Sequence, residues 1–168
     1  DALGIQEQLP EVPVVSVEGT LHPVQLVYRP LRVGQSIVEA TVDAIVQTVP
    51  RHAKDTLVFL PGQSEIFRVR EQLQRLPSLR ELSIHPLFGG MNLEEQSRAI
   101  LPSDRRRIIL STNIAETSLT IEGVTAVVDS GLARVMRFEP SVGLARLVLE
   151  PISQAGATQR AGRAGRIE

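Results

Sequence analysis

The amino-acid sequence predicts an α/β domain, built on a mostly parallel sheet with helices on both faces. Short apolar runs alternate with longer amphipathic segments along the 168 residues, a pattern typical of parallel strands joined by helices. This length fits one domain with a sizeable core, and 42% apolar and 22% charged residues are ordinary globular proportions. We therefore expect one domain over 1–168, with a leading segment and the first strands in 1–34 and the core in 35–168.

Each element is assigned from the spacing of its apolar residues. The strands are expected where apolar and β-branched residues form short runs: 12–17, 24–28, 56–60, 82–87, 107–110, 124–128 and 144–149. The helices are expected where apolar residues recur at helical spacing: 36–49, 63–76, 93–101 and 156–165. In the second of these helices, for example, Ile66, Val69 and Leu73 share one face.

Composition excludes several classes of protein. Lys and Arg number 18 against 19 Asp and Glu, so any nucleic acid must be bound by a local surface rather than by overall positive charge. The absence of cysteine excludes disulfides, thiolate catalysis and cysteine-ligated zinc. Three scattered histidines, His22, His52 and His85, show no metal-ligand spacing, so no metal site is expected in this chain. No apolar run reaches the ~18 residues of a membrane span, and no leader is recognisable, so a soluble, cytoplasmic protein is expected. We also expect it to be a monomer.

Candidate ligand-binding loops follow the expected strands. In a parallel sheet of this kind, ligands bind beyond the carboxyl ends of the strands. The segments 61–65, 88–90, 111–113 and 129–131 occupy those places and are rich in glycine, hydroxyl and amide groups. Such residues suit a phosphate chain, although turns and helix caps also require them.

The most informative segment is 159–166, Gln-Arg-Ala-Gly-Arg-Ala-Gly-Arg. Arg160, Arg163 and Arg166 recur every third residue, and pairs of small residues between them let a ligand approach the backbone. Three neighbouring arginines repel one another unless an anion or carboxylates share the site. Each glycine costs a helix roughly 1 kcal/mol relative to alanine, which argues against an idle helix end. The segment therefore indicates an anion-binding function.

A second segment, 111–123, combines a strand end with a short helical turn rich in hydroxyl groups. It also fits a capped turn, in which Asn113 is the N-cap and Glu116 completes a capping box. The two interpretations are compatible.

These segments together resemble the DEAH-box group of superfamily 2 RNA helicases. FLPGQSEI resembles motif IV, STNIAETSLTI resembles motif V and QRAGRAGR resembles motif VI. PLFGG and AVVDSGLAR resemble further characteristic stretches, and all five segments follow one another along the chain in the order found in the family. The segments MNLEEQ and FEPSVGLARL are most similar in sequence to those of the bacterial HrpB-type members. The resemblance covers about residues 18–166 and implies a RecA-like fold, the C-terminal lobe of the helicase core, over 1–168.

The resemblance implies roles in ATP hydrolysis. Arg163 and Arg166 match the two arginine fingers that neutralise charge on the transferred phosphate, and Gln159 matches the residue that places the attacking water. The expected nucleotide-binding positions are Ser118, Glu122, Arg160 and Gly162. Relatives often carry Asp at the position of Glu122, near the ribose, and some stack an aromatic residue on adenine where this chain has Ile100.

The resemblance also implies contacts with single-stranded RNA. Thr112 and Asn113 match residues that hold the RNA backbone, and Gly89 and Gly90 lie where relatives often use Ser or Thr. At the two glycines only backbone N–H groups could bind phosphate.

The sequence contains neither a G-x-x-x-x-G-K-[ST] loop nor an Asp-Glu-x-His motif. The phosphate cradle and the Mg²⁺ ligands are therefore expected from the first RecA-like domain of the same protein, which also shares ATP and RNA, and the fragment alone is expected to be inactive. Two alternatives remain. The chain could be a non-catalytic single-stranded nucleic-acid-binding module, although it has few aromatic residues for stacking, or its arginines could dock on a protein partner.

Overall fold

The computed structural model describes residues 23–117, 119–139 and 143–165. Its centre is a four-stranded parallel sheet in the order β2-β3-β1-β4. The strands of this sheet are β1 (Asp55–Phe59), β2 (Ser83–Leu87), β3 (Arg107–Ser111) and β4 (Val124–Asp129). The predicted strand 12–17 lies outside the described residues.

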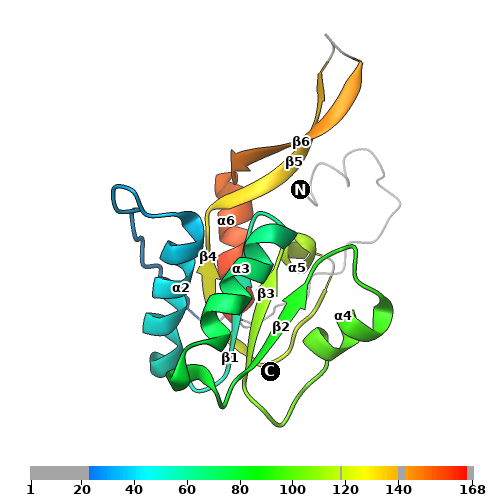
Figure 1. Ribbon diagram of the computed structural model, residues 1–168. Coiled ribbons are helices and arrows are strands. Elements are labelled where there is room, and N and C mark those ends of the chain that lie inside the picture. The colour runs from blue at the N-terminus through cyan, green and yellow to red at the C-terminus, as the bar shows by residue number, and fades with distance from the viewer. Residues whose placement is uncertain (1–22, 118, 140–142, 166–168) are drawn as a thin grey trace, which may run out of the picture.

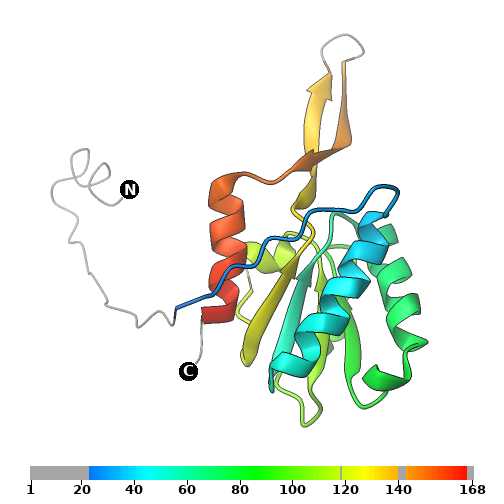
Figure 2. The ribbon, with the colours of Figure 1, turned by 90° about the vertical axis from the view of Figure 1, so that its left-hand side faces the viewer.

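Helices cover both faces of the sheet, which confirms the predicted α/β class (Figure 1). The helices are α2 (Ile37–Thr48), α3 (Gln63–Gln74), α4 (Leu93–Ile100), α5 (Ile114–Thr117) and α6 (Gln154–Ala161), with 3₁₀ turns at η1 (Val49–Arg51), η2 (Pro77–Leu79) and η3 (Gly162–Gly165). Helices α2 and α3 lie on one face, and α4, α5 and α6 lie on the other (Figure 2).

Alternation along the buried strands divides the core into two layers. Val58 of β1 faces α2 and α3, whereas its neighbours Leu57 and Phe59 face the opposite side. All five residues of β1 and of β3 are buried, as expected for central strands covered on both faces. Among the described residues, the buried apolar side chains are aliphatic apart from that of Phe59.

Helix boundaries follow capping signals in the sequence. Ser36 and Glu39 form a capping box at the start of α2, and Asn92 and Glu95 form one at the start of α4. Helix α6 begins two residues earlier than predicted because Ser153 caps it by accepting a hydrogen bond from the backbone N–H of Gly156. Its predicted continuation through the glycine-rich segment is a tighter 3₁₀ turn, η3.

A buried ion pair ties together the edge of the sheet where the strands begin. Arg107 is 2% exposed, and its guanidinium contacts the Asp55 carboxylate at 2.6 and 2.7 Å. The same guanidinium donates to the carbonyls of Ala99, Leu101 and Glu122. One side chain therefore joins β1 and β3 to the end of α4 and to the loop before β4.

The predicted strand at 24–28 is wrong. This segment is extended and mostly exposed, with side chains such as Tyr28 in solvent, but it pairs with no strand in the part of the chain that the structure describes. Alternating apolar residues give a segment strand propensity, whereas a strand also needs a neighbouring row of backbone donors and acceptors.

A two-stranded antiparallel hairpin projects beyond the sheet (Figures 1 and 2). It consists of β5 (Leu132–Glu139) and β6 (Leu144–Pro151); the sequence predicted most of β6 and missed β5. From the register, one face of the hairpin carries four exposed apolar side chains: Met136, Phe138, Leu147 and Leu149. The other face carries the ion pairs Arg137–Glu150 and Arg146–Glu139.

Candidate functional site

The loops at the carboxyl ends of the four strands lie along one edge of the sheet, as predicted. Backbone hydrogen bonds hold them together there. The N–H of Leu60 donates to the carbonyl of Ser111 (2.8 Å), the N–H of Thr112 to the carbonyl of Leu87 (3.2 Å) and the N–H of Ser130 to the carbonyl of Phe59 (3.0 Å). Because all four strands are parallel, segments far apart in the sequence form one continuous rim, at the edge where sheets of this kind bind ligands.

The expected RNA-contacting residues lie on this rim. Asn113, Gly89 and Gly90 are exposed, and Thr112 is half-buried. A Cβ atom built on Gly89 would meet nothing within 4 Å, and one on Gly90 would meet only the Phe88 ring at 3.7 Å. The two glycines therefore leave open space rather than satisfying a packing constraint, and their role toward RNA stays a prediction.

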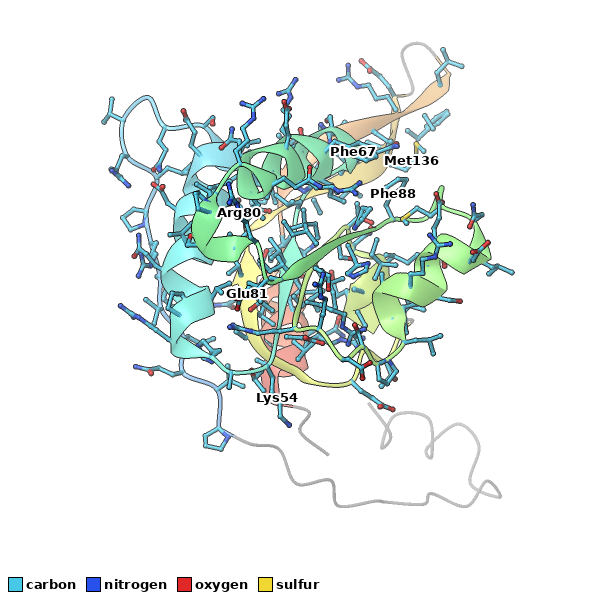
Figure 3. All side chains as sticks on the ribbon, turned by 60° about the horizontal axis from the view of Figure 1, so that its bottom comes forward. Lys54, Phe67, Arg80, Glu81, Phe88 and Met136 are labelled. Atoms are coloured by element: carbon cyan, nitrogen blue, oxygen red, sulfur yellow. The ribbon has the colours of Figure 1, made fainter. Side chains whose placement is uncertain are left out.

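Two aromatic rings border the rim. Phe67 of α3 and Phe88 after β2 meet edge to face, with ring centroids 5.9 Å apart and an interplanar angle of 76°. Figure 3 shows both side chains far from Lys54, which precedes β1 at the opposite edge. Phe67 is 43% exposed, so an apolar surface adjoins the glycine pair.

Arg160 is the centre of a buried polar network. It is 1% exposed; its Nε donates to the Glu116 carboxylate at 3.0 Å and its Nη1 to the Asp129 carboxylate at 2.9 Å. Its guanidinium lies 4.8 Å from the centroid of the Phe59 ring, in cation–π geometry. The carboxylates expected to share the site with the arginines are therefore Glu116 and Asp129. The role of Arg160 toward a nucleotide stays a prediction, because here its hydrogen bonds are made within the domain.

Arg163 is also buried, at 6% exposure. Its guanidinium donates to the main-chain carbonyl of Glu116 from Nη2 (2.5 Å) and Nε (3.1 Å), and to that of Leu119 from Nη1 (2.6 Å). The predicted finger thus lies against the loop that follows β3, and its role toward phosphate stays a prediction.

The other expected nucleotide-binding residues are separated. Gln159 is exposed on α6, and Gly162 opens η3, where a Cβ atom would meet nothing within 4 Å. Glu122 is exposed just before β4, at the opposite edge of the sheet from the rim. Ile100 is half-buried and packs against the core layer on the side of α4. Ser118 and Arg166 lie outside the described residues.

Comparison with known proteins places the chain in a family. The family described as "Helicase conserved C-terminal domain" matches residues 39–168. The chain belongs to this helicase family. The relatives agree with the predicted HrpB-type resemblance: the chain is 47% identical over 167 residues to the ATP-dependent RNA helicase HrpB of Escherichia coli, covering 98% of this chain and 20% of that protein. It is 41% identical over 160 residues to the ATP-dependent RNA helicase HrpA of Borreliella burgdorferi, covering 92% and 19%.

Solved structures agree on the fold of this helicase domain. The crystal structure of the Escherichia coli DEAH/RHA helicase HrpB superposes with a TM-score of 0.87 at 47% identity, covering 99% of this chain and 21% of that chain. The predicted RecA-like lobe is therefore confirmed. The chain spans about a fifth of the length of HrpB.

A second ion pair attaches the hairpin to the rim of the helicase domain. Arg134 of β5 donates to both oxygens of Glu65 at the start of α3, at 2.7 and 3.0 Å. The Arg134 guanidinium passes so close to Gly62 that a Cβ there would lie 1.8 Å from its Nη1 atom. Hydrogen bonding from Arg134 holds the pKa of the Glu65 carboxyl below its ordinary value.

This pair predicts a pH-dependent stability. Because the pKa of Glu65 is lower in the folded state than the ~4.3 of the unfolded chain, its contribution is complete above that value and is lost as pH falls through the folded-state pKa. We expect Glu65→Gln to lower the free energy of unfolding at pH 7 by up to about 1 kcal/mol, and this deficit should shrink below about pH 4. Urea unfolding at about pH 7 and about pH 3 measures both values.

Glu71→Gln is the matched control, since it removes an exposed carboxylate paired with Arg75 on the same helix. If Glu65→Gln lowered the free energy of unfolding equally at both pH values, the effect would not come from the ion pair between ionised Glu65 and Arg134.

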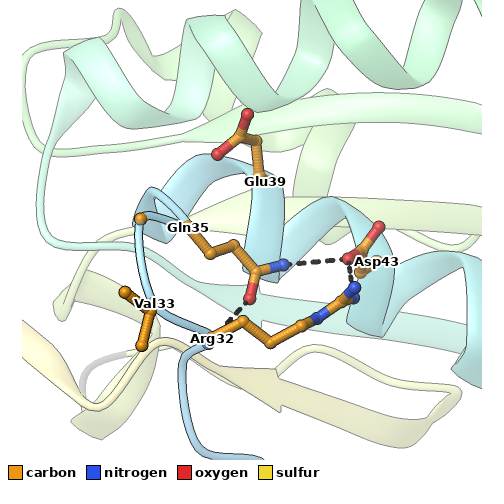
Figure 4. Close-up of a pocket in the computed structure, with 6 residues that line it drawn as sticks. Arg32, Val33, Gln35, Glu39 and Asp43 are labelled. Atoms are coloured by element: carbon orange, nitrogen blue, oxygen red, sulfur yellow. Dashed lines mark hydrogen bonds and ion pairs between the residues drawn. The ribbon is translucent and has the colours of Figure 1, made fainter.

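A hollow in the described surface lies away from the predicted site residues. It measures about 430 Å³ and is lined by residues 32–35 together with Glu39 and Asp43 (Figure 4). Asp43 already accepts hydrogen bonds from Arg32 (2.7 Å) and Gln35 (2.9 Å). None of the predicted site residues lines this hollow.

Groups of possible metal ligands and long apolar helices are both absent from the described residues. These residues contain no group of three or more His, Asp or Glu side chains arranged to hold a metal ion. None of their helices is long and apolar enough to cross a membrane.

Sequence reasoning missed the roles of Phe59, Asp129 and Arg134. Asp129 lies in a loop that the sequence singled out, but its pairing with Arg160 across 31 positions required the fold. Nothing in the spacing of β5 indicated that Arg134 reaches Glu65, 69 positions away.

Proposed function

We propose that this chain is the C-terminal RecA-like lobe of an ATP-dependent RNA helicase, which supplies arginine fingers to ATP hydrolysis and holds single-stranded RNA by its backbone. The observation that carries the proposal is the convergence of two segments far apart in sequence. Arg160 and Arg163, from the segment 159–166, both bond to Glu116, which closely follows the expected RNA-binding pair Thr112 and Asn113. The names of the relatives, ATP-dependent RNA helicases, point to the same function.

In this proposal ATP is a substrate shared between two lobes. Arg163 and Arg166 neutralise charge that develops on the γ-phosphate, and Gln159 orients the attacking water. Ser118, Glu122 and the open backbone at Gly162 contribute to nucleotide binding. The Mg²⁺ ion that accompanies ATP is held by the first RecA-like domain.

RNA crosses the rim at the carboxyl ends of the strands. Thr112 and Asn113 bind the phosphate backbone with their side-chain donors, and the N–H groups of Gly89 and Gly90 add further donors. Such contacts read no base, so the grip of this lobe is independent of RNA sequence.

The experiment compares the full-length protein with this 168-residue chain in ATP hydrolysis, with and without single-stranded RNA. We expect RNA to stimulate turnover by the full-length protein and the chain alone to show negligible turnover, since it lacks the phosphate-binding loop. Hydrolysis by the purified chain that drops on Arg163→Ala would contradict the division of the active site. RNA binding by the full-length protein without stimulated turnover would favour the non-catalytic binding module.

A further inference from the structure

Helix α5 is the element through which the candidate RNA site and Arg163 meet. It begins directly after Thr112 and Asn113. Its third residue, Glu116, accepts hydrogen bonds from two arginines of α6 and η3: Arg160 at the carboxylate and Arg163 at the main-chain carbonyl. A displacement at one end of this short helix therefore changes the geometry at the other.

The Glu116 carboxylate fixes α5 against α6. Its Oε2 atom accepts from Arg160, whose guanidinium is in turn held by Asp129 and by the Phe59 ring. Its Oε1 atom lies so near Gly156 that a Cβ on that glycine would approach it to 3.3 Å. The Glu116 side chain is 19% exposed and lies between the two helices, and its partner Arg160 cannot easily move aside because it is 1% exposed.

Helix α5, together with Leu119 beyond its end, holds Arg163 inward. Three hydrogen bonds, of 2.5, 2.6 and 3.1 Å, join its guanidinium to the carbonyls of Glu116 and Leu119. To neutralise a phosphate, the guanidinium must exchange carbonyl oxygens for phosphate oxygens. Any shift of α5 moves the Glu116 carbonyl and so changes how firmly Arg163 is held.

We propose that Glu116 is a positioning residue that makes the engagement of Arg163 with ATP depend on RNA. This inference rests on the proposed function and names a regulation of the same site. RNA bound at Thr112 and Asn113 displaces the start of α5; the carboxylate transmits the displacement to Arg160 and the carbonyl transmits it to Arg163. Without the carboxylate, α5 loses its bond to Arg160 and keeps only the carbonyl contact to Arg163, so the response of the finger to RNA is weakened.

The test measures ATP turnover by the full-length protein with and without saturating single-stranded polyuridylate, together with the Kd for that RNA. Coupling between sites is commonly worth about 5–150-fold, so we expect Glu116→Ala to lower the ratio of stimulated to basal turnover by about 10-fold. The RNA Kd should change less than about threefold, since this residue touches no RNA. Glu116→Gln keeps the shape and one acceptor and should retain an intermediate ratio. Glu71→Gln removes an exposed carboxylate of α3 that pairs with Arg75, and it should leave the ratio of stimulated to basal turnover unchanged.

An unchanged ratio in folded Glu116→Ala and Glu116→Gln proteins would overturn the inference. So would an equal fall of both rates, which would mark Glu116 as a structural residue only. If Glu116→Ala does not fold, Glu116→Gln decides alone. Arg163→Ala separates this inference from the proposed function. If Arg163→Ala retains ATP turnover, the role of Arg163 as an arginine finger is wrong. If Arg163→Ala loses turnover while the Glu116 variants keep the wild-type ratio of stimulated to basal turnover, only the role of Glu116 is wrong.

Discussion

Arg163→Ala in the full-length protein is expected to lower ATP turnover by on the order of 10²–10⁵, the range over which arginine fingers act. The side chain supplies a planar, permanently charged group that binds two phosphate oxygens at once. Arg166→Ala should produce a loss in the same range. Steady-state hydrolysis at saturating RNA measures the change, and an RNA-binding assay should show that both variants still bind.

The burial of Arg163 requires a control for folding. Its three hydrogen bonds to carbonyls mean that alanine also removes a structural contact. Arg163→Lys keeps a charge without the two-pronged geometry, so its turnover should remain strongly reduced while its melting temperature stays closer to that of the wild type. Arg75→Ala, at an exposed ion pair, should affect neither property. If RNA binding falls in step with turnover, the arginines act on RNA or on the fold rather than on phosphate.

Arg107→Met is expected to have the largest effect on stability, about 3–5 kcal/mol, which is typical when one partner of a buried ion pair is removed. The change leaves the Asp55 carboxylate buried without its guanidinium and deprives the carbonyls of Ala99, Leu101 and Glu122 of a donor. Since small domains are stable by about 5–15 kcal/mol, the change removes a large part of the margin that keeps the domain folded. Urea or thermal unfolding and soluble yield measure the effect.

Two further variants test the cause. Arg75→Met removes an exposed pair and should cost less than about 0.5 kcal/mol. Arg107→Met combined with Asp55→Leu removes both charges and should be more stable than Arg107→Met alone, because no carboxylate is then left unpaired. Equal instability of the single and double variants would show that the carbonyl contacts, and not the ion pair, hold this edge together.

The sequence predicted those parts of the fold that follow from local patterns. Helix α3 could be found because Ile66, Val69 and Leu73 repeat at helical spacing, and the central strands because buried strands read as short apolar runs. The hairpin strand β5 could not be found in this way. Its residues are exposed or half-buried, and charged Arg134 and Arg137 lie on opposite faces, so no alternation distinguishes it from a loop.

The candidate site was predictable as a set of motifs but not as an arrangement. The arginines of the segment 159–166 indicated that carboxylates or an anion must lie nearby, and the structure supplies Glu116 and Asp129 for Arg160. Which arginine takes which partner depends on the placement of α5, α6 and the end of β4, and this placement is set by packing across the sheet. Local spacing contains no information about it.

Gly62 has a consequence for how this domain can change over evolutionary time. A methyl group there would lie 1.8 Å from the Arg134 guanidinium, so the site of the hairpin's ion pair is also the site of a steric restriction. The clash is with the flexible end of the Arg134 side chain, so a side chain at position 62 displaces the guanidinium from Glu65 unless position 134 has already become smaller. The two positions, far apart in the chain, are therefore epistatic: the effect of a substitution at one on the hairpin's ion pair depends on the residue present at the other.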